Sequence, residues 1–202
     1  MRAHKYRLDG GQRRKSIITR QGNMNLYTST LLLSAISAAL FVIFGAYTQK
    51  CKPMMMAFLR STKAAVVFFG GSALWFLYLL SQLGEADFGQ IRHLLIAVFA
   101  IAGFLAFFYL NDFLSVRGVC VLILLLGRQF LDSAFMQEPA SRLVLVTQTY
   151  IWICIALYMG ALPYRMRDFF EYIYEKPLRA KILGYIFLAC ALSLLISMIF
   201  YA

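Results

Sequence analysis

Residues 26–47 read LYTSTLLLSAISAALFVIFGAY, and none of these 22 residues carries a charge. As a helix with a rise of ~1.5 Å per residue, the segment would be about 33 Å long, enough to cross a hydrocarbon core of roughly 30 Å. The end of the segment offers no good small-residue cleavage site of the kind that follows a signal peptide. The stretch therefore predicts a retained transmembrane helix.

Five further apolar blocks follow, and together they predict an all-α integral membrane protein. We expect a bundle of about six transmembrane helices with one or two interfacial amphipathic helices. Of all residues, 61% are hydrophobic and 14% are charged, whereas roughly half of the residues of a soluble protein are apolar. Residues 1–25 form a basic polar tail, and residues 26–202 are predicted to form a single transmembrane domain with spans at about 26–47, 64–84, 93–111, 113–135, 143–162 and 182–201.

The fourth block is interrupted by two arginines. Only ten residues separate Arg117 from Arg128, which is too short for a span. The two lie about three helical turns apart, so both side chains could extend from one helix face toward opposite interfaces. A helix over 113–135 would then cross the bilayer. The alternative is a re-entrant or interfacial segment, which would leave five spans.

Short-range features predict how the spans are joined and packed. Asn111-Asp112 is typical of a tight turn, which would make the third and fourth helices an antiparallel hairpin. Small residues predict close helix contacts at Gly70-Gly71 and at Ala102 and Ala106.

The basic residues give conflicting evidence on orientation. With six spans, one side carries ten Lys and Arg residues in its loops and the other carries three, namely Arg92, Arg128 and Arg142. The seven basic residues of the tail fall on the weaker side and equalise the two, although cytoplasmic loops normally hold the excess. Two explanations remain open. Either Met24 is the true start, which lowers the net charge from +11 to +5, or the tail is cytoplasmic and the fourth segment does not cross.

The loop 163–181 contains an amphipathic pattern. Met166, Phe169, Phe170 and Ile173 follow the i, i+3, i+4, i+7 spacing of one helix face, while Arg165 and Arg167 lie among the polar residues. We expect these six residues to form a lipid interface, with the aromatic rings in the acyl boundary. Loop 48–63 resembles a shorter version. Both segments are interpreted as interfacial connectors, and the alternative is a shared platform for acidic lipids or a partner.

A small set of polar residues within or beside the spans forms the candidate substrate site. Arg128 and Asp132 are spaced i, i+4 and can pair, and Arg117 follows Asp112. With Gln148 in the fifth block, they could attract an anion along the fourth helix or line a polar pocket between the fourth and fifth helices. The structural alternative is two arginines tied to local carboxylates, with Gln148 bonded to a neighbouring helix.

Several classes of function lack the residues they need. The sequence has no metal-binding H-E-x-x-H, phosphate-binding or dinucleotide-binding pattern, and its four cysteines form no CxxC pair. The membrane-embedded serine and histidine of an intramembrane protease are not both present. The nine acidic residues lie in loops or at block ends, which disfavours proton-coupled transport. We expect no metal, no cofactor and no nucleic-acid partner, and an enzyme is the minority interpretation.

These observations favour a non-catalytic accessory, scaffold or sensor-partner component of a bacterial-type inner membrane. Its expected partners are the lipid bilayer, anionic lipid headgroups and a further membrane protein. The alternative is a small permease or lipid-handling protein for an anionic substrate, and a membrane enzyme is third.

Overall fold

The computed structural model describes residues 24–46, 48–83, 91–109 and 113–201, with only the backbone at 46 and 48–50. Within these ranges every regular element is helical, as predicted, and six helices are long and apolar enough to span a membrane. The tail and the Asn111-Asp112 turn lie outside the described residues.

The first two long apolar helical segments each contain a π-helical stretch. α2 (Leu26–Phe41) continues directly into η1 (Val42–Ala46). α4 (Thr62–Ala65), η2 (Val66–Gly70) and α5 (Gly71–Ser81) follow one another in the same way. The Ser61 hydroxyl caps α4 by accepting a hydrogen bond from the Ala64 amide at 3.2 Å, which satisfies one of the free donors at the helix start.

The other four long helices are α6 (Arg92–Tyr109), α7 (Leu114–Ala134), α8 (Arg142–Ala161) and α10 (Pro177–Ile199). α7 is continuous through Arg117 and Arg128, as the six-span prediction requires. α10 begins at Pro177, five residues before the expected position, because proline is well suited to the first turn of a helix.

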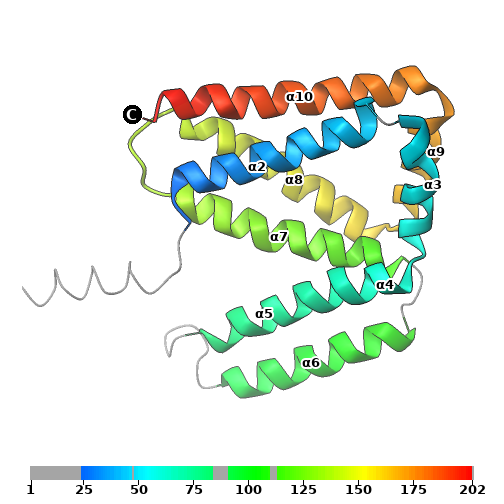
Figure 1. Cartoon of the computed structure of the whole chain (residues 1–202). Helices are drawn as coiled ribbons and strands as arrows, with labels where there is room; N and C mark the ends of the chain where they lie inside the picture. Colours follow the sequence, from blue (N-terminus) through cyan, green and yellow to red (C-terminus); the bar gives the residue numbers. More distant parts are fainter. Residues whose placement is uncertain (1–23, 47, 84–90, 110–112, 202) are drawn as a thin grey trace, which may run out of the picture.

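The helices form a central group with a two-helix layer on one side. α2 and η1 run along α10, α7 packs on α8, and α2 also contacts α7. α5 packs on the outer side of α7, and α6 packs on α5 (Figure 1). The third and fourth long helices, α6 and α7, were expected to pack together as a hairpin. Instead, α5 lies between them, although α6 and α7 are consecutive in the chain (Figure 1).

Two shorter helices, α3 (Thr48–Leu59) and α9 (Tyr164–Glu175), lie side by side across one end of the bundle (Figure 1). We call this pair the cap. The Ser115 hydroxyl at the start of α7 donates toward the carbonyl oxygens of Phe58 and Leu59 at 3.0 and 3.1 Å, which ties the end of α3 to the bundle. The start of α2 and the end of α10, together with the loop 135–141, lie at the opposite end (Figure 1).

Candidate functional site

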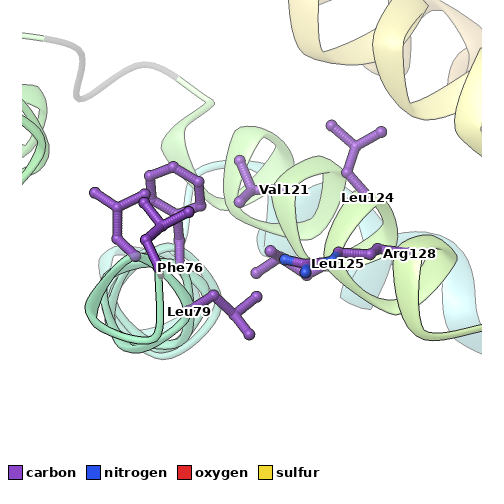
Figure 2. A pocket seen from close by; sticks show the side chains of 8 residues that line it. Phe76, Leu79, Val121, Leu124, Leu125 and Arg128 are labelled. Carbon is purple, nitrogen blue, oxygen red and sulfur yellow. The ribbon is translucent and has the colours of Figure 1, made fainter. Parts of the chain in front are cut away.

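The structure contains an apolar groove between α5, α6 and α7. It consists of two cavities of about 290 and 360 Å³ that share Phe76 and Val121 in their walls. The first lies between α5 and α7 (Figure 2), and the second extends to α6. The lining residues of the first are Phe76, Leu79, Leu80, Leu83, Val121, Leu124, Leu125 and Arg128, and the second adds Phe69, Ser72, Ala73, Leu77, Phe99, Ala102 and Gly103.

The groove exists because α5 and α7 touch at one end and diverge toward the other (Figure 1). At the touching end, Gly118 of α7 lies directly against the backbone of Phe68 and Phe69 in η2. Two helices that cross at an angle lie farther apart with increasing distance from the crossing point. At the separated end, the leucines at the C-terminal end of α5 face Leu124 and Arg128 across the first cavity.

Arg128 is the charged residue in the wall of the first cavity. Its guanidinium nitrogens extend from α7 toward α5, where Phe76 and Leu79 lie (Figure 2). The Arg128 Nε lies 3.7 Å from Asp132 Oδ2, as the i, i+4 spacing predicts, and the two side chains are 55% and 45% exposed. The pair is therefore open to the surroundings, and the guanidinium is within reach of a molecule in the groove.

A second arginine, Arg92, lies near the end of α5 and lines neither cavity. Arg92 at the start of α6 donates from Nη1 to the carbonyl oxygen of Ser81 at 3.4 Å. Ser81 ends α5 two residues before the cavity residue Leu83. The contact therefore places Arg92 beside the C-terminal end of α5.

The structure does not bring the other predicted substrate residues into this groove. Arg117 is half-buried near the start of α7 and does not line either of the two cavities. Asp112, its expected partner, lies outside the described residues. The anion path expected along α7 therefore has Arg128 at one cavity and Arg117 at a separate place.

Gln148 faces α10 rather than Arg128. Its Nε2 donates to Ser193 Oγ at 2.8 Å and to the Cys190 carbonyl oxygen at 3.1 Å. The contact between α7 and α8 is instead apolar and tight, since a Cβ on Gly127 would lie 3.1 Å from the Ile153 side chain. Gln148 and Arg128 therefore do not line one polar pocket, contrary to that expectation. The geometry matches the alternative, in which Gln148 forms a hydrogen bond to a neighbouring helix.

The apolar face of α9 packs against protein, which corrects the expected lipid interface. Phe170 and Ile173 are 4% and 7% exposed, and Met166 and Phe169 pack beside them against the same buried cluster. That cluster includes Phe44 and residues of α3, α7, α8 and α10. Amphipathic spacing identifies an apolar face but not what covers it, and here the bundle end covers it.

The two arginines predicted for this interface are exposed. Arg167 pairs with Asp168 at 3.1 Å and with Glu171 at 3.8 Å. Arg165 lies over the ring of Tyr164, with 5.6 Å between the guanidinium carbon and the ring centroid. Their contact with lipid stays a prediction.

The groove residues other than Arg128 were missed because hydropathy treats every uncharged residue of a span alike. Ser72, Ala73 and Phe76 gave no pattern that separates a cavity wall from a lipid-facing surface. Among the described residues, no group of three or more His, Cys, Asp or Glu side chains could hold a metal ion, and the four cysteines are free thiols.

No protein-family model matches this sequence, and neither a curated protein nor a solved structure matches it.

Proposed function

We propose that the chain is a non-catalytic, multi-pass protein of a bacterial-type inner membrane that binds the acyl chain of a lipid in the groove between α5, α6 and α7. The observation that best supports this proposal is the pair of apolar cavities joined at Phe76 and Val121. This develops the lipid-handling interpretation of the sequence.

The exposed apolar surface of α6 supports placement of the protein in a bilayer. None of the residues of α6 is buried, although it is one of the most apolar helices in the chain. Ile101, Phe104 and Phe108 are 60%, 65% and 64% exposed. An apolar surface of this kind would be costly in water, because soluble proteins rarely expose contiguous apolar patches of more than a few hundred Å². Lipid around α6 would remove that cost.

The cavity walls support an acyl chain as the occupant. The two cavities, about 290 and 360 Å³, are near the lower end of the size range of small-molecule sites, which begins at roughly 300 Å³. Their walls are mainly Leu, Phe, Val and Ala side chains, with Ser72 as a small polar exception whose hydroxyl donates to the Phe69 carbonyl oxygen. A methylene chain would fill such a space without leaving a polar group unpaired.

Native mass spectrometry of the full chain in mild detergent tests this function. We expect the wild-type protein to retain lipid, and Val121→Trp to lose it because the indole fills the junction between the cavities. Leu157→Trp is the matched control, since Leu157 is an exposed residue of α8 on another part of the bundle. Circular dichroism confirms folding of each variant. Equal lipid retention by folded Val121→Trp and Leu157→Trp would refute the proposal.

A second candidate is an accessory, scaffold or sensor-partner role in which a transmembrane helix of another membrane protein covers α6. The observation that favours it is that α6 packs on α5 and buries none of its own residues. A photo-crosslinker at Phe104 should then give one protein adduct, and that protein should be present at a fixed stoichiometry in the purified, uncrosslinked complex. A crosslinker at Leu157 should give none. Adducts with lipid alone at both positions would contradict this candidate.

A further inference from the structure

We infer that the lipid in this groove carries an anionic phosphate headgroup, which Arg128 and Arg92 hold at the end of the groove beside the C-terminus of α5. The inference rests on the lipid-binding function proposed above and adds the chemistry of the headgroup. It also assigns the lipid to one leaflet.

Arg128 is the first of the two cations. It stands in a cavity wall whose other residues are leucine, phenylalanine and valine. A charged side chain beside an apolar, membrane-facing cavity is costly unless a counter-charge or water reaches it. The Asp132 carboxylate meets this need only in part, because its one contact with the guanidinium is 3.7 Å from Nε, beyond hydrogen-bond distance.

The remaining Arg128 donors have no acceptor among the described residues. A guanidinium presents five N–H groups in a planar fork that matches the oxygens of a phosphate. Phosphate oxygens at the mouth of the first cavity would accept two of these bonds at once, a charge-assisted arrangement about twice as strong as a neutral one. The acyl chain attached to the same molecule would then lie among Phe76, Leu79 and Val121.

Arg92 provides the second cation. Its Nη1 donates to the Ser81 carbonyl oxygen at 3.4 Å, which holds the side chain at the end of α5, and this is its one hydrogen bond to the described residues. Arg92 also begins the 18-residue helix α6, whose free backbone amides add partial positive charge at the same place.

The position along the bundle assigns the leaflet. The arginine end of the groove lies opposite the cap, since α6 begins and α5 ends there. Counted without the tail, ten of the thirteen basic residues lie on the cap side, and the excess of positive charge would then make the cap side cytoplasmic. The headgroup would therefore belong to a lipid of the non-cytoplasmic leaflet.

The test is a competition among lipids of equal chain length, measured by native mass spectrometry of the full chain in detergent. The probes are phosphatidylglycerol, phosphatidylcholine and diacylglycerol. We expect phosphatidylglycerol to bind at least about tenfold more tightly than diacylglycerol, with phosphatidylcholine between them because its choline cation offsets the same phosphate, and Arg128→Gln to remove this preference while chain binding persists. Arg117→Gln, at the other end of the same helix, is the matched control and should keep the preference.

Asp132→Asn supplies an independent variant. If Asp132 competes with the phosphate for Arg128, this substitution should tighten phosphatidylglycerol binding several-fold and leave diacylglycerol binding unchanged. Addition of 10 mM inorganic phosphate should not displace the lipid if the chain and headgroup bind together, and displacement would show that a free anion is the ligand. Equal binding of all three lipids to the wild-type protein would overturn the phosphate assignment and leave the groove function intact, whereas no binding of any lipid would overturn both.

Discussion

Gly118 of α7 lies so close to Phe69 of η2 that a Cβ atom on the glycine would be 2.6 Å from the Phe69 Cα. Gly184 of α10 and Gly45 of η1 show the same relationship, with 2.6 Å between a Gly184 Cβ and the Gly45 Cα. Both π-helical segments of the structure are thus the places where a glycine of another helix approaches most closely. π-helical turns widen the backbone locally and interrupt regular packing, so each crossing combines an irregular turn with a residue that has no side chain.

We predict that Gly118→Ala is strongly destabilising, by about 2 kcal/mol or more, because the atom it meets is backbone and cannot rotate away. Unfolding by SDS, followed by circular dichroism, measures the free energy. Gly71→Ala is the control, since a Cβ there meets no atom within 4 Å, and it should be neutral or slightly stabilising. Equal stabilities of the two variants would contradict the close approach.

The crossing of α10 with η1 makes a similar prediction at a second site. Gly184→Ala should lower stability by about 1–3 kcal/mol, because α2 and η1 would have to move away from α10. Gly103→Ala in α6, where a Cβ meets no atom within 4 Å, is the control and should retain full stability in the same assay. A wild-type free energy of unfolding for Gly184→Ala would show that the two helices are farther apart.

The interhelical bonds of Gln148 should make a modest contribution. Gln148→Leu is expected to cost about 0.6 kcal/mol and at most about 1.7 kcal/mol, the average and the maximum measured for hydrogen bonds between membrane helices. The buried Oε1, which has no partner among the described residues, limits the loss. Thr147→Val, at an exposed position one residue earlier, should cost little. A double-mutant cycle with Ser193→Ala isolates the pair, and the absence of coupling would argue against the bond.

The packing of α9 on the bundle end predicts that Phe170 is a core residue. Phe170→Ala should reduce stability by about 3–5 kcal/mol, as for other buried aromatic residues. Leu178→Ala, at a 67% exposed position next to the cap, should change stability by less than about 0.5 kcal/mol. If Phe170 faced lipid instead, the two substitutions would have similarly small effects.

Tyr174 predicts a change of stability at high pH. Burial, with a smaller contribution from the nearby Cys51 thiolate, raises the pKa of the Tyr174 phenol to about 12 from 10.0. The unfolded chain would ionise first, so this group's contribution to stability is present below pH 10 and is lost as the pH rises toward 12.

The stability of Tyr174→Phe should therefore decrease less steeply with pH than that of the wild-type protein between these two pH values. At neutral pH it should cost little, since the buried hydroxyl has no hydrogen-bond partner among the described residues. Tyr172→Phe, at an exposed position of the same helix, should behave like wild type across the range. Identical pH profiles for all three proteins would contradict the burial of the phenol.

The sequence predicted where the helices lie along the chain better than it predicted which helices pack together. Hydropathy located the six apolar helices, and the spacing of Arg117 and Arg128 allowed one continuous α7. Spacing also identified the apolar face at Phe170 and Ile173. It could not distinguish a face covered by lipid from one covered by protein, because both environments select the same side chains.

Contacts between helices were mostly beyond prediction, since they depend on which distant segment lies opposite. Gly118 and Gly184 carry the tightest crossings, whereas the small residues singled out in the sequence included Gly71, where a Cβ would meet no atom within 4 Å, and the exposed Ala102. Gln148 was correctly expected to suit a hydrogen bond between helices, but its partner is α10. The groove was not foreseen because it depends on α5 lying between α6 and α7.

The most direct test of the six-span architecture is the sidedness of three single cysteines in a cysteine-free background. Arg60→Cys and Glu171→Cys are exposed positions of the cap region, and Gln137→Cys lies in the connection after α7. With a membrane-impermeant maleimide on intact cells, we expect Gln137→Cys to be labelled and the other two to be labelled only after permeabilisation. Labelling of Gln137→Cys and Arg60→Cys from the same side would mean that α7 does not cross, and would contradict the account.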